Sequence, residues 1–307
     1  MTFSVPATRN LLLFTAIAAG MVTSWALPVL AGGSTVALVA GALLFGMLTQ
    51  PLWALLHECM HDMFHPDRRV NDLFGFLMSA VQPSSFKLLR CVHSGHHVSN
   101  RSKRERIEYY SEGESHVRKS VLYYALLFGL NWMGFVGQNV MFTLVPVPLI
   151  RRWRLDQRFG STLPSLSDGA LRRFALEFGA VVLLHAALVA LTPVTLGQYA
   201  LYLWTNALFY SQLRYIYHYE SDFDVVDGAF DLRAPTWLSR CLLNSTYHLT
   251  HHRNPRVPWI HLPAIAVGER QHSMGARILR QWHGVMPEVS QPRRHGRVIR
   301  WNGQSMF

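Results

Sequence analysis

The 307-residue sequence predicts an all-α integral membrane protein with four transmembrane helices in two hairpins, plus helices that lie in the membrane interface. Half of the residues are hydrophobic and only 15% are charged, which is too apolar for an ordinary soluble domain. Four apolar runs approach the roughly 20 residues that a bilayer crossing needs. The net charge is +11, but basic residues collect at the ends of these runs rather than alternating with aromatic residues. This favours a membrane surface as the partner and excludes nucleic acid.

The first hairpin is predicted from two apolar runs, at about residues 11–30 and 35–56. The pair Gly32-Gly33 breaks the sequence between them and allows a tight turn. Both free ends of the hairpin should therefore lie on one side of the membrane. The second run continues directly into residues 57–62, which places the first histidine cluster at the membrane face.

The second hairpin is predicted from runs 174–191 and 196–217, which are joined by a short turn containing threonine and proline. If all histidine clusters meet on one side, the intervening run 121–150 must return to the side that it left. It would then lie in the interface, dip into the membrane and out again, or form a broken hairpin. The residues expected at such a break are Gly134, Gly137, Pro146 and Pro148.

Basic groups at 101–106, 118–119, 151–154 and 172–173 fall on the same predicted side as the histidines. By the positive-inside rule this side faces the cytoplasm, as in a multi-pass protein of the bacterial cytoplasmic membrane. We expect the arginine-rich segment 101–106 to be a solvated surface. Residues 1–292 are predicted to form a single membrane domain, and residues 293–307 a basic tail.

Histidines are clustered in three places along the chain. Eight of the 16 histidines lie in these clusters: His57 and His61; His93, His96 and His97; and His248, His251 and His252. A ninth, His218, ends the last apolar run. Residues three and four apart share one face of a helix, so each cluster can aim its imidazoles at one point. One zinc ion takes three or four protein ligands, so eight or nine imidazoles indicate two metal ions with open positions.

The three clusters, in this order after membrane hairpins, resemble the histidine boxes of the membrane fatty acid desaturase and hydroxylase superfamily. The resemblance covers about residues 10–260. It implies a mushroom-shaped helical protein whose four spans carry a cytosolic helical cap, and this cap holds the boxes. It also implies two non-haem iron ions, with O2 as co-substrate, that desaturate or hydroxylate the hydrocarbon chain of a fatty acyl or other lipid substrate.

The resemblance also assigns roles to individual residues. The implied iron ligands are His57, His61, His93, His96, His97, His248, His251 and His252. His218 resembles an extra histidine that some members place between the second and third boxes, although Tyr217 stands where many relatives have glutamate. Asn244 and Asp62 are candidates for residues that contact the ligand histidines without binding the metal themselves.

Several reactions fit the same boxes. Alkene-forming fatty acid decarboxylases and carotenoid-type ketolases or hydroxylases share them with desaturases. A zinc-dependent membrane hydrolase is the non-oxidative alternative, but Glu58 in His-Glu-x-x-x-His departs from the His-Glu-x-x-His spacing of zinc proteases. A metal transporter would carry its ligands inside the spans rather than at their ends.

An oxygenase of this kind needs electrons from another protein. The sequence has no four-cysteine iron–sulfur spacing and no dinucleotide-binding glycine pattern. It also lacks the His-Pro-Gly-Gly stretch of a fused haem domain. We therefore expect an external donor, either ferredoxin-like or a small haem protein with its reductase, that docks on the basic cytoplasmic face.

Overall fold

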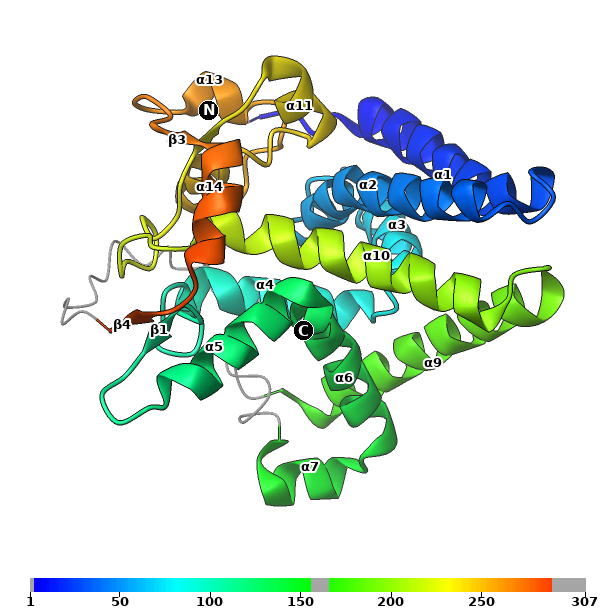
Figure 1. Cartoon of the computed structure of the whole chain (residues 1–307), viewed down its shortest axis with the longest axis horizontal. Helices are drawn as coiled ribbons and strands as arrows, with labels where there is room; N and C mark the ends of the chain where they lie inside the picture. Colours follow the sequence, from blue (N-terminus) through cyan, green and yellow to red (C-terminus); the bar gives the residue numbers. More distant parts are fainter. Residues whose placement is uncertain (1–2, 156–165, 289–307) are drawn as a thin grey trace.

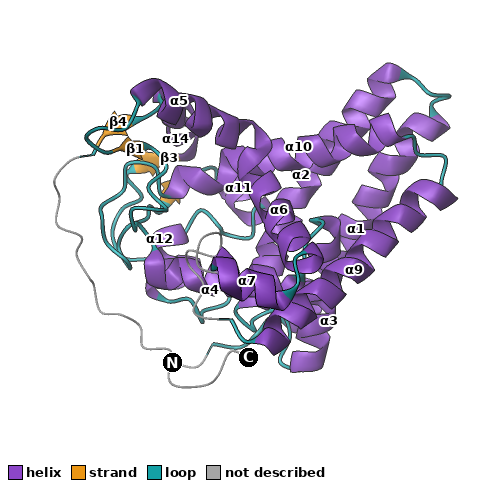
Figure 2. Cartoon of the chain, turned by 90° about the horizontal axis from the view of Figure 1, so that it is seen from below, coloured by secondary structure: helices purple, strands orange, loops and turns teal. Residues whose placement is uncertain are grey.

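The computed structural model describes residues 3–155 and 166–288, so the predicted tail at 293–307 lies outside the described residues. Long helices extend to one side, and short helices and strands gather at the opposite end (Figures 1 and 2). The helices are α1 (Ala7–Leu30), α2 (Thr35–Met60), α3 (Arg68–Val81), α4 (Phe86–Ser99), α5 (His116–Ala125), η1 (Leu126–Leu130), α6 (Asn131–Leu144), α7 (Val147–Trp153), α9 (Asp168–Leu191), α10 (Leu196–Arg214), η2 (Tyr215–Tyr217), α11 (Thr236–Cys241), α12 (His248–Arg253), α13 (Leu262–Ile265), α14 (Met274–Arg280) and η3 (Gln281–His283). The strands are β1 (Tyr109–Tyr110), β2 (Leu232–Arg233), β3 (His272–Ser273) and β4 (Met286–Pro287).

Helices α1 and α2 form the predicted first hairpin (Figure 1). Gly32 and Gly33 make the turn in the left-handed backbone region, with φ of 61° and 80°, where glycine is favoured. The Ser34 side chain then accepts a hydrogen bond from the backbone N–H of Ala37 and so caps α2. Because α2 continues to Met60, His57 lies in its last turn.

Helices α9 and α10 form the predicted second hairpin, whose turn lies at the same end of the molecule as the first turn (Figure 1). A capping box starts α10: the Gln198 amide oxygen accepts from the Thr195 N–H at 2.9 Å, and the Thr195 hydroxyl accepts from the Gln198 N–H at 3.2 Å. Helix α10 packs against α2 on one side and η1 on another, which puts it at the centre of the bundle.

The run 121–150 is bent, as α5 and α6 meet at an angle (Figure 1). The bend lies at Gly129, which has a φ of 117° inside η1. The predicted break is present at Pro146, between the end of α6 and the start of α7. The prediction of a break at Gly134 and Gly137 was wrong, because both residues lie within α6. A Cβ on Gly129 would approach the Cβ of Ala207 to 3.3 Å, so α10 passes close to the backbone at this point.

Within residues 3–155 and 166–288, four helical segments are long and apolar enough to cross a membrane, the number that the sequence predicted. One member differs: the segment is His116–Leu144 rather than α10. Helix α10 carries more polar side chains than the other long helices, and several of them are buried within the bundle. Tyr202 donates to the Ser24 carbonyl at 2.6 Å, and Asn206 donates to the Gln82 amide oxygen at 3.0 Å. Such internal hydrogen bonds allow polar side chains within a membrane bundle.

The end that carries the histidines is held together by contacts between distant segments. Strand β1 pairs in parallel with β4, and β2 pairs in parallel with β3. Helix α4 is capped by Ser85, whose hydroxyl also donates to the Glu177 carboxylate of α9 at 2.7 Å. The indole of Trp259 donates to the amide oxygen of Asn10, in the first turn of α1, at 2.9 Å. These contacts fix the histidine-bearing end of the molecule against the bundle of long helices.

The basic segment 101–106 follows its prediction only in part: Lys103 and Arg104 are exposed as expected, whereas Arg101 is not. Arg101 was expected on a solvated surface, but only 1% of its side chain is exposed. It forms an ion pair of 2.8 Å with the fully buried Glu108 and donates to the Ser221 carbonyl at 3.0 Å. The turn after α4 is therefore packed beneath the segment that follows α10.

Candidate metal centre

Four segments that are far apart in the sequence converge at the end of the bundle. They are the C-terminal end of α2, helix α4, the residue after η2, and helix α12. They bring together all nine predicted histidines in two groups, within each of which the potential ligand atoms lie within 4.8 Å of one another. The first group contains His57, His61, His93, His97 and His251; the second contains His96, His218, His248 and His252.

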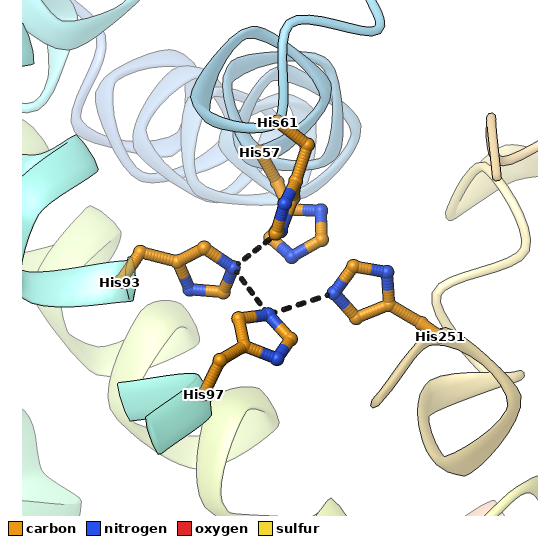
Figure 3. A group of neighbouring side chains, drawn as sticks. All are labelled: His57, His61, His93, His97 and His251. Carbon is orange, nitrogen blue, oxygen red and sulfur yellow. Dashed lines mark hydrogen bonds between the residues drawn. The ribbon is translucent and has the colours of Figure 1, made fainter. Parts of the chain in front are cut away.

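The first group surrounds a common point (Figure 3). The Nε2 atom of His93 lies 2.8 Å from Nε2 of His61 and 3.1 Å from Nε2 of His97. The Nε2 atom of His97 is in turn 3.1 Å from Nε2 of His251. The Nε2 atom of His57 is buried and has no hydrogen-bond partner. A buried polar nitrogen without a hydrogen-bond partner is unfavourable, and a bound metal ion would supply the missing partner.

The second group is built in the same way. Nε2 of His248 lies 2.9 Å from Nε2 of His218 and 3.3 Å from Nε2 of His252. The ring of His96 completes this group and lies 4.9 Å from the ring of His218, centroid to centroid. His218 is therefore placed with the box histidines, despite the tyrosine that precedes it.

Hydrogen bonds between the imidazoles do not account for this convergence. Each imidazole nitrogen offers either one proton or one lone pair. Nε2 of His93 and Nε2 of His97 each have two other Nε2 atoms within 3.1 Å, so one contact at each would remain unsatisfied. A metal ion bound at about 2.0–2.1 Å from each nitrogen would space adjacent ligands by about 2.9–3.4 Å. The observed spacings fit a cation at the centre of each group.

In two of these histidines the other ring nitrogen, Nδ1, contacts a partner that orients the ring. Nδ1 of His96 lies 2.9 Å from a Glu105 carboxylate oxygen, and Nδ1 of His218 lies 2.9 Å from the Gly228 carbonyl. Donation from Nδ1 leaves Nε2 with its lone pair free for a metal, the usual arrangement around ligand histidines. The sequence alone does not pair Glu105 with His96, because nine residues of unknown path separate them, and it cannot indicate Gly228, because a backbone carbonyl has no sequence signature.

Helix α12 is anchored by a residue that the sequence did not indicate. The Asp231 carboxylate accepts hydrogen bonds from the N–H of Thr250, at 3.0 Å, and from its hydroxyl. Asp231 and Tyr247 also form an isolated β-bridge. The segment after His218 thus fixes the helix that carries three further histidines. Asp231 lies 19 residues from Thr250, so no local pattern connects the two.

The two other predicted contact residues have partners other than histidine. The Asn244 amide donates to the Trp259 carbonyl at 3.1 Å. The Asp62 carboxylate accepts from Arg90 at 3.0 Å and from Asn71 at 3.5 Å. A role of either residue towards a metal stays a prediction.

Burial keeps these imidazoles neutral. It lowers the pKa of most of the cluster histidines outside the spans well below the usual value, and neighbouring histidines lower these pKa values further. This set consists of His61, His93, His97, His218, His248 and His252. Burial followed by the nearby His96 lowers the pKa of His251 to about 3. Metals bind neutral imidazole, so the site is in its binding form at pH 7.

A cavity of about 410 Å³ adjoins the histidines. On the bundle side Trp53, Phe135 and Tyr210 line it, from α2, α6 and α10. On the cap side it reaches Arg104 and Ile107. Its size lies within the range of about 300–1,000 Å³ that is usual for small-molecule sites. The cavity is therefore large enough for a small molecule, and its apolar side chains lie beside the imidazoles.

Comparisons with known proteins agree with this arrangement. A family model described as fatty acid desaturase matches residues 33–283, a range that contains all nine histidines. A protein named fatty acid desaturase from Bacillus subtilis (strain 168) is 26% identical over 227 residues. The matched region covers 69% of this chain and 62% of that relative, so it spans less than two thirds of the relative's length.

Proposed function

Because the chain belongs to the fatty acid desaturase family, we propose that it is an O2-dependent membrane oxidoreductase. It would desaturate, or hydroxylate, the hydrocarbon chain of a fatty acyl or other lipid substrate. The observation that carries this proposal is the pair of buried histidine groups beside a mainly apolar cavity. Two groups of five and four imidazoles exceed the three or four protein ligands of one zinc ion.

The nine histidines would hold two non-haem iron ions, one in each group. Bound iron would supply the oxidising power, drawn from O2, that removal of hydrogen from an unactivated carbon requires. The chain's own residues bind and orient the substrate. Trp53, Phe135 and Tyr210 offer an apolar wall for the hydrocarbon, and this wall would limit access of water to the reacting carbons on its side of the cavity.

Related reactions use the same parts. Alkene-forming decarboxylation of a fatty acid and carotenoid-type ketolation or hydroxylation need the same ligands, and differ in which carbon lies next to them. The zinc-hydrolase alternative would require a carboxylate free to activate water. Glu58 lines the cavity, but one of its oxygens accepts from the Trp259 N–H at 3.1 Å. The number of imidazoles favours the oxidative reading.

Electrons would come from a separate ferredoxin-like or small haem protein with its reductase. We propose that the donor docks on the cytoplasmic face of a bacterial cytoplasmic membrane. The positive-inside rule places the basic, histidine-bearing end of the protein on this face. A positively charged face would attract an acidic donor and speed its association at low salt. Turnover should therefore fall as ionic strength rises, whereas turnover that is indifferent to salt would contradict this mode of docking.

Metal analysis together with lipid profiling tests the main proposal. The purified full-length protein should contain two irons per chain, and a host that expresses it should accumulate a new double bond, hydroxyl or terminal alkene only when oxygen is present. His116→Ala is a matched control, because His116 is exposed and belongs to neither group. One zinc per chain with a hydrolysed lipid product would overturn the proposal.

A further inference from the structure

A positively charged side chain, that of Arg214, lines the cavity on the membrane side of the histidines. Arg214, the last residue of α10, lines the cavity, and its Nη2 donates to the Gln50 amide oxygen at 3.0 Å. Gln50 precedes His57 on α2 by seven residues, about two helical turns. Among the described residues, Nη2 is the only Arg214 side-chain nitrogen with a hydrogen-bond partner, and Nε is buried without one.

The guanidinium is held in place by its surroundings. Its carbon lies 5.8 Å from the Trp53 ring centroid and 6.0 Å from that of Tyr210, both at the limit for cation–π attraction. Gln50 is buried, and its amide nitrogen donates to the Thr49 hydroxyl at 3.2 Å, which turns the amide oxygen towards Arg214. The cation is thus positioned before any ligand arrives.

No described carboxylate neutralises this charge. The two acidic residues that line the same cavity are engaged elsewhere, Glu58 with the Trp259 N–H and Glu105 with His96 and Ser99. A cation removed from water without a counter-ion is costly. A basic residue in the last turn of a helix stabilises the helix dipole, but a solvated side chain would do so equally well. The half-buried position of Arg214 in the cavity lining, without a counter-ion, therefore requires another explanation.

We propose that Arg214 binds the carboxylate of a free fatty acid, which deepens the proposed function and rests on it. A carboxylate would supply the missing negative charge and would accept hydrogen bonds from the guanidinium nitrogens that have no partner. Because Arg214 is four residues before His218, the carbons that follow the carboxylate would lie next to the histidines. The substrate's acid end would thus determine which carbons react.

Binding measurements test this inference without turnover. The probe is radiolabelled palmitate bound to the metal-loaded full-length protein in detergent, without oxygen or electron donor, with methyl palmitate and 1-hexadecanol as competitors. The acid should bind about 10–100-fold more tightly than the ester or the alcohol, the usual range for a hydrogen bond to a charged group. Arg214→Gln should reduce acid binding to the level of the ester and leave ester binding unchanged. Arg214→Lys should keep part of the preference.

Three results would overturn the inference. The first is equal binding of acid and ester by the unmodified protein, which needs no variant and so is independent of folding. The second is an acid preference that survives in Arg214→Gln. The third is a preference that Arg104→Gln abolishes and Arg214→Gln does not, since Arg104 lies at the cap end and would bind the acid in the reverse direction. The exposed Arg240→Gln is the control.

The two proposals can fail separately. Arg214-dependent binding of palmitate with no oxidised product under any donor would refute the oxygenase and leave the carboxylate site standing. Oxidised products formed equally well from acid and ester would refute only the carboxylate site.

Discussion

His97 and His251 stand 154 positions apart in the chain, yet their Nε2 atoms lie 3.1 Å apart. The contact joins α4 to α12, so neither helix can shift without opening the first histidine group. Stability of the cap and completeness of the metal site are therefore linked, because a metal bound only by the folded protein adds its binding free energy to folding.

We expect His97→Ala and His252→Ala each to abolish oxidation of lipid while membrane insertion remains intact. Each change removes one imidazole from a different group, and neither residue lies in a span. Iron content per chain and lipid products are the readouts, with His116→Ala as the control. Full activity of either variant would remove that residue from the ligand set.

Glu105→Ala should weaken iron binding about 10–100-fold, the usual effect of deleting the partner of a ligand histidine. Glu105→Gln should weaken it less, because an amide oxygen still accepts from Nδ1 of His96. Iron affinity is measured by competition with a chelator, and the exposed Glu112→Gln serves as the matched control. Equal affinity in all three variants would contradict the orienting role.

Metal-free protein should lose stability in acid. The buried histidines have folded-state pKa values below the unfolded value of about 6.5. Protons therefore bind the unfolded chain first as the pH falls. The unfolding temperature should stay level above about pH 7 and decline from about pH 6.5 towards the pKa of about 3 of His251. An unfolding temperature that stays level from about pH 7 down to about pH 4 would contradict this assignment.

Asp231→Ala should destabilise the protein by about 1–3 kcal/mol, because it leaves the Thr250 N–H and hydroxyl without their charged acceptor. Iron affinity should fall as well, since α12 carries ligands of both groups. Thermal unfolding and chelator competition measure the two effects. The control is Asp227→Asn, which alters only the exposed ion pair with Arg253 near the same helix; a comparable loss there would argue against a specific anchor.

Gly129→Ala should destabilise the protein by about 1–3 kcal/mol, because alanine is strained at a φ of 117° and its Cβ would crowd Ala207. Gly134→Ala is the matched change within α6, where a Cβ meets nothing within 4 Å. It should be neutral or stabilise the helix by about 0.5–1 kcal/mol. Thermal unfolding in detergent compares the two variants, and equal effects would refute the bend at Gly129.

The sequence was sufficient for features that depend on local pattern. Apolar runs separated by Gly32-Gly33 and by a threonine–proline turn predicted both hairpins. The histidine spacing identified eight of the nine residues that converge, and the ninth, His218, was identified by its place at the end of an apolar run. Features that depend on tertiary packing were missed. The bend lies at Gly129 because α10 passes there, and Arg101 is buried because Glu108 meets it. Gly228, Asp231 and Arg214 acquire their roles only through residues distant in sequence.

The two His-x-x-His-His boxes serve the two groups in opposite ways. In the second box the outer pair, His93 and His97, enters the first group and His96 enters the second. In the third box the outer pair, His248 and His252, enters the second group and His251 the first. Helices α4 and α12 thus each contribute histidines to both groups, and a metal ion bound in one group would fix the rotation of the helices that build the other. The consequence is cooperative occupancy: ferrous titration of the metal-free protein should pass from empty to doubly loaded chains with little singly loaded species.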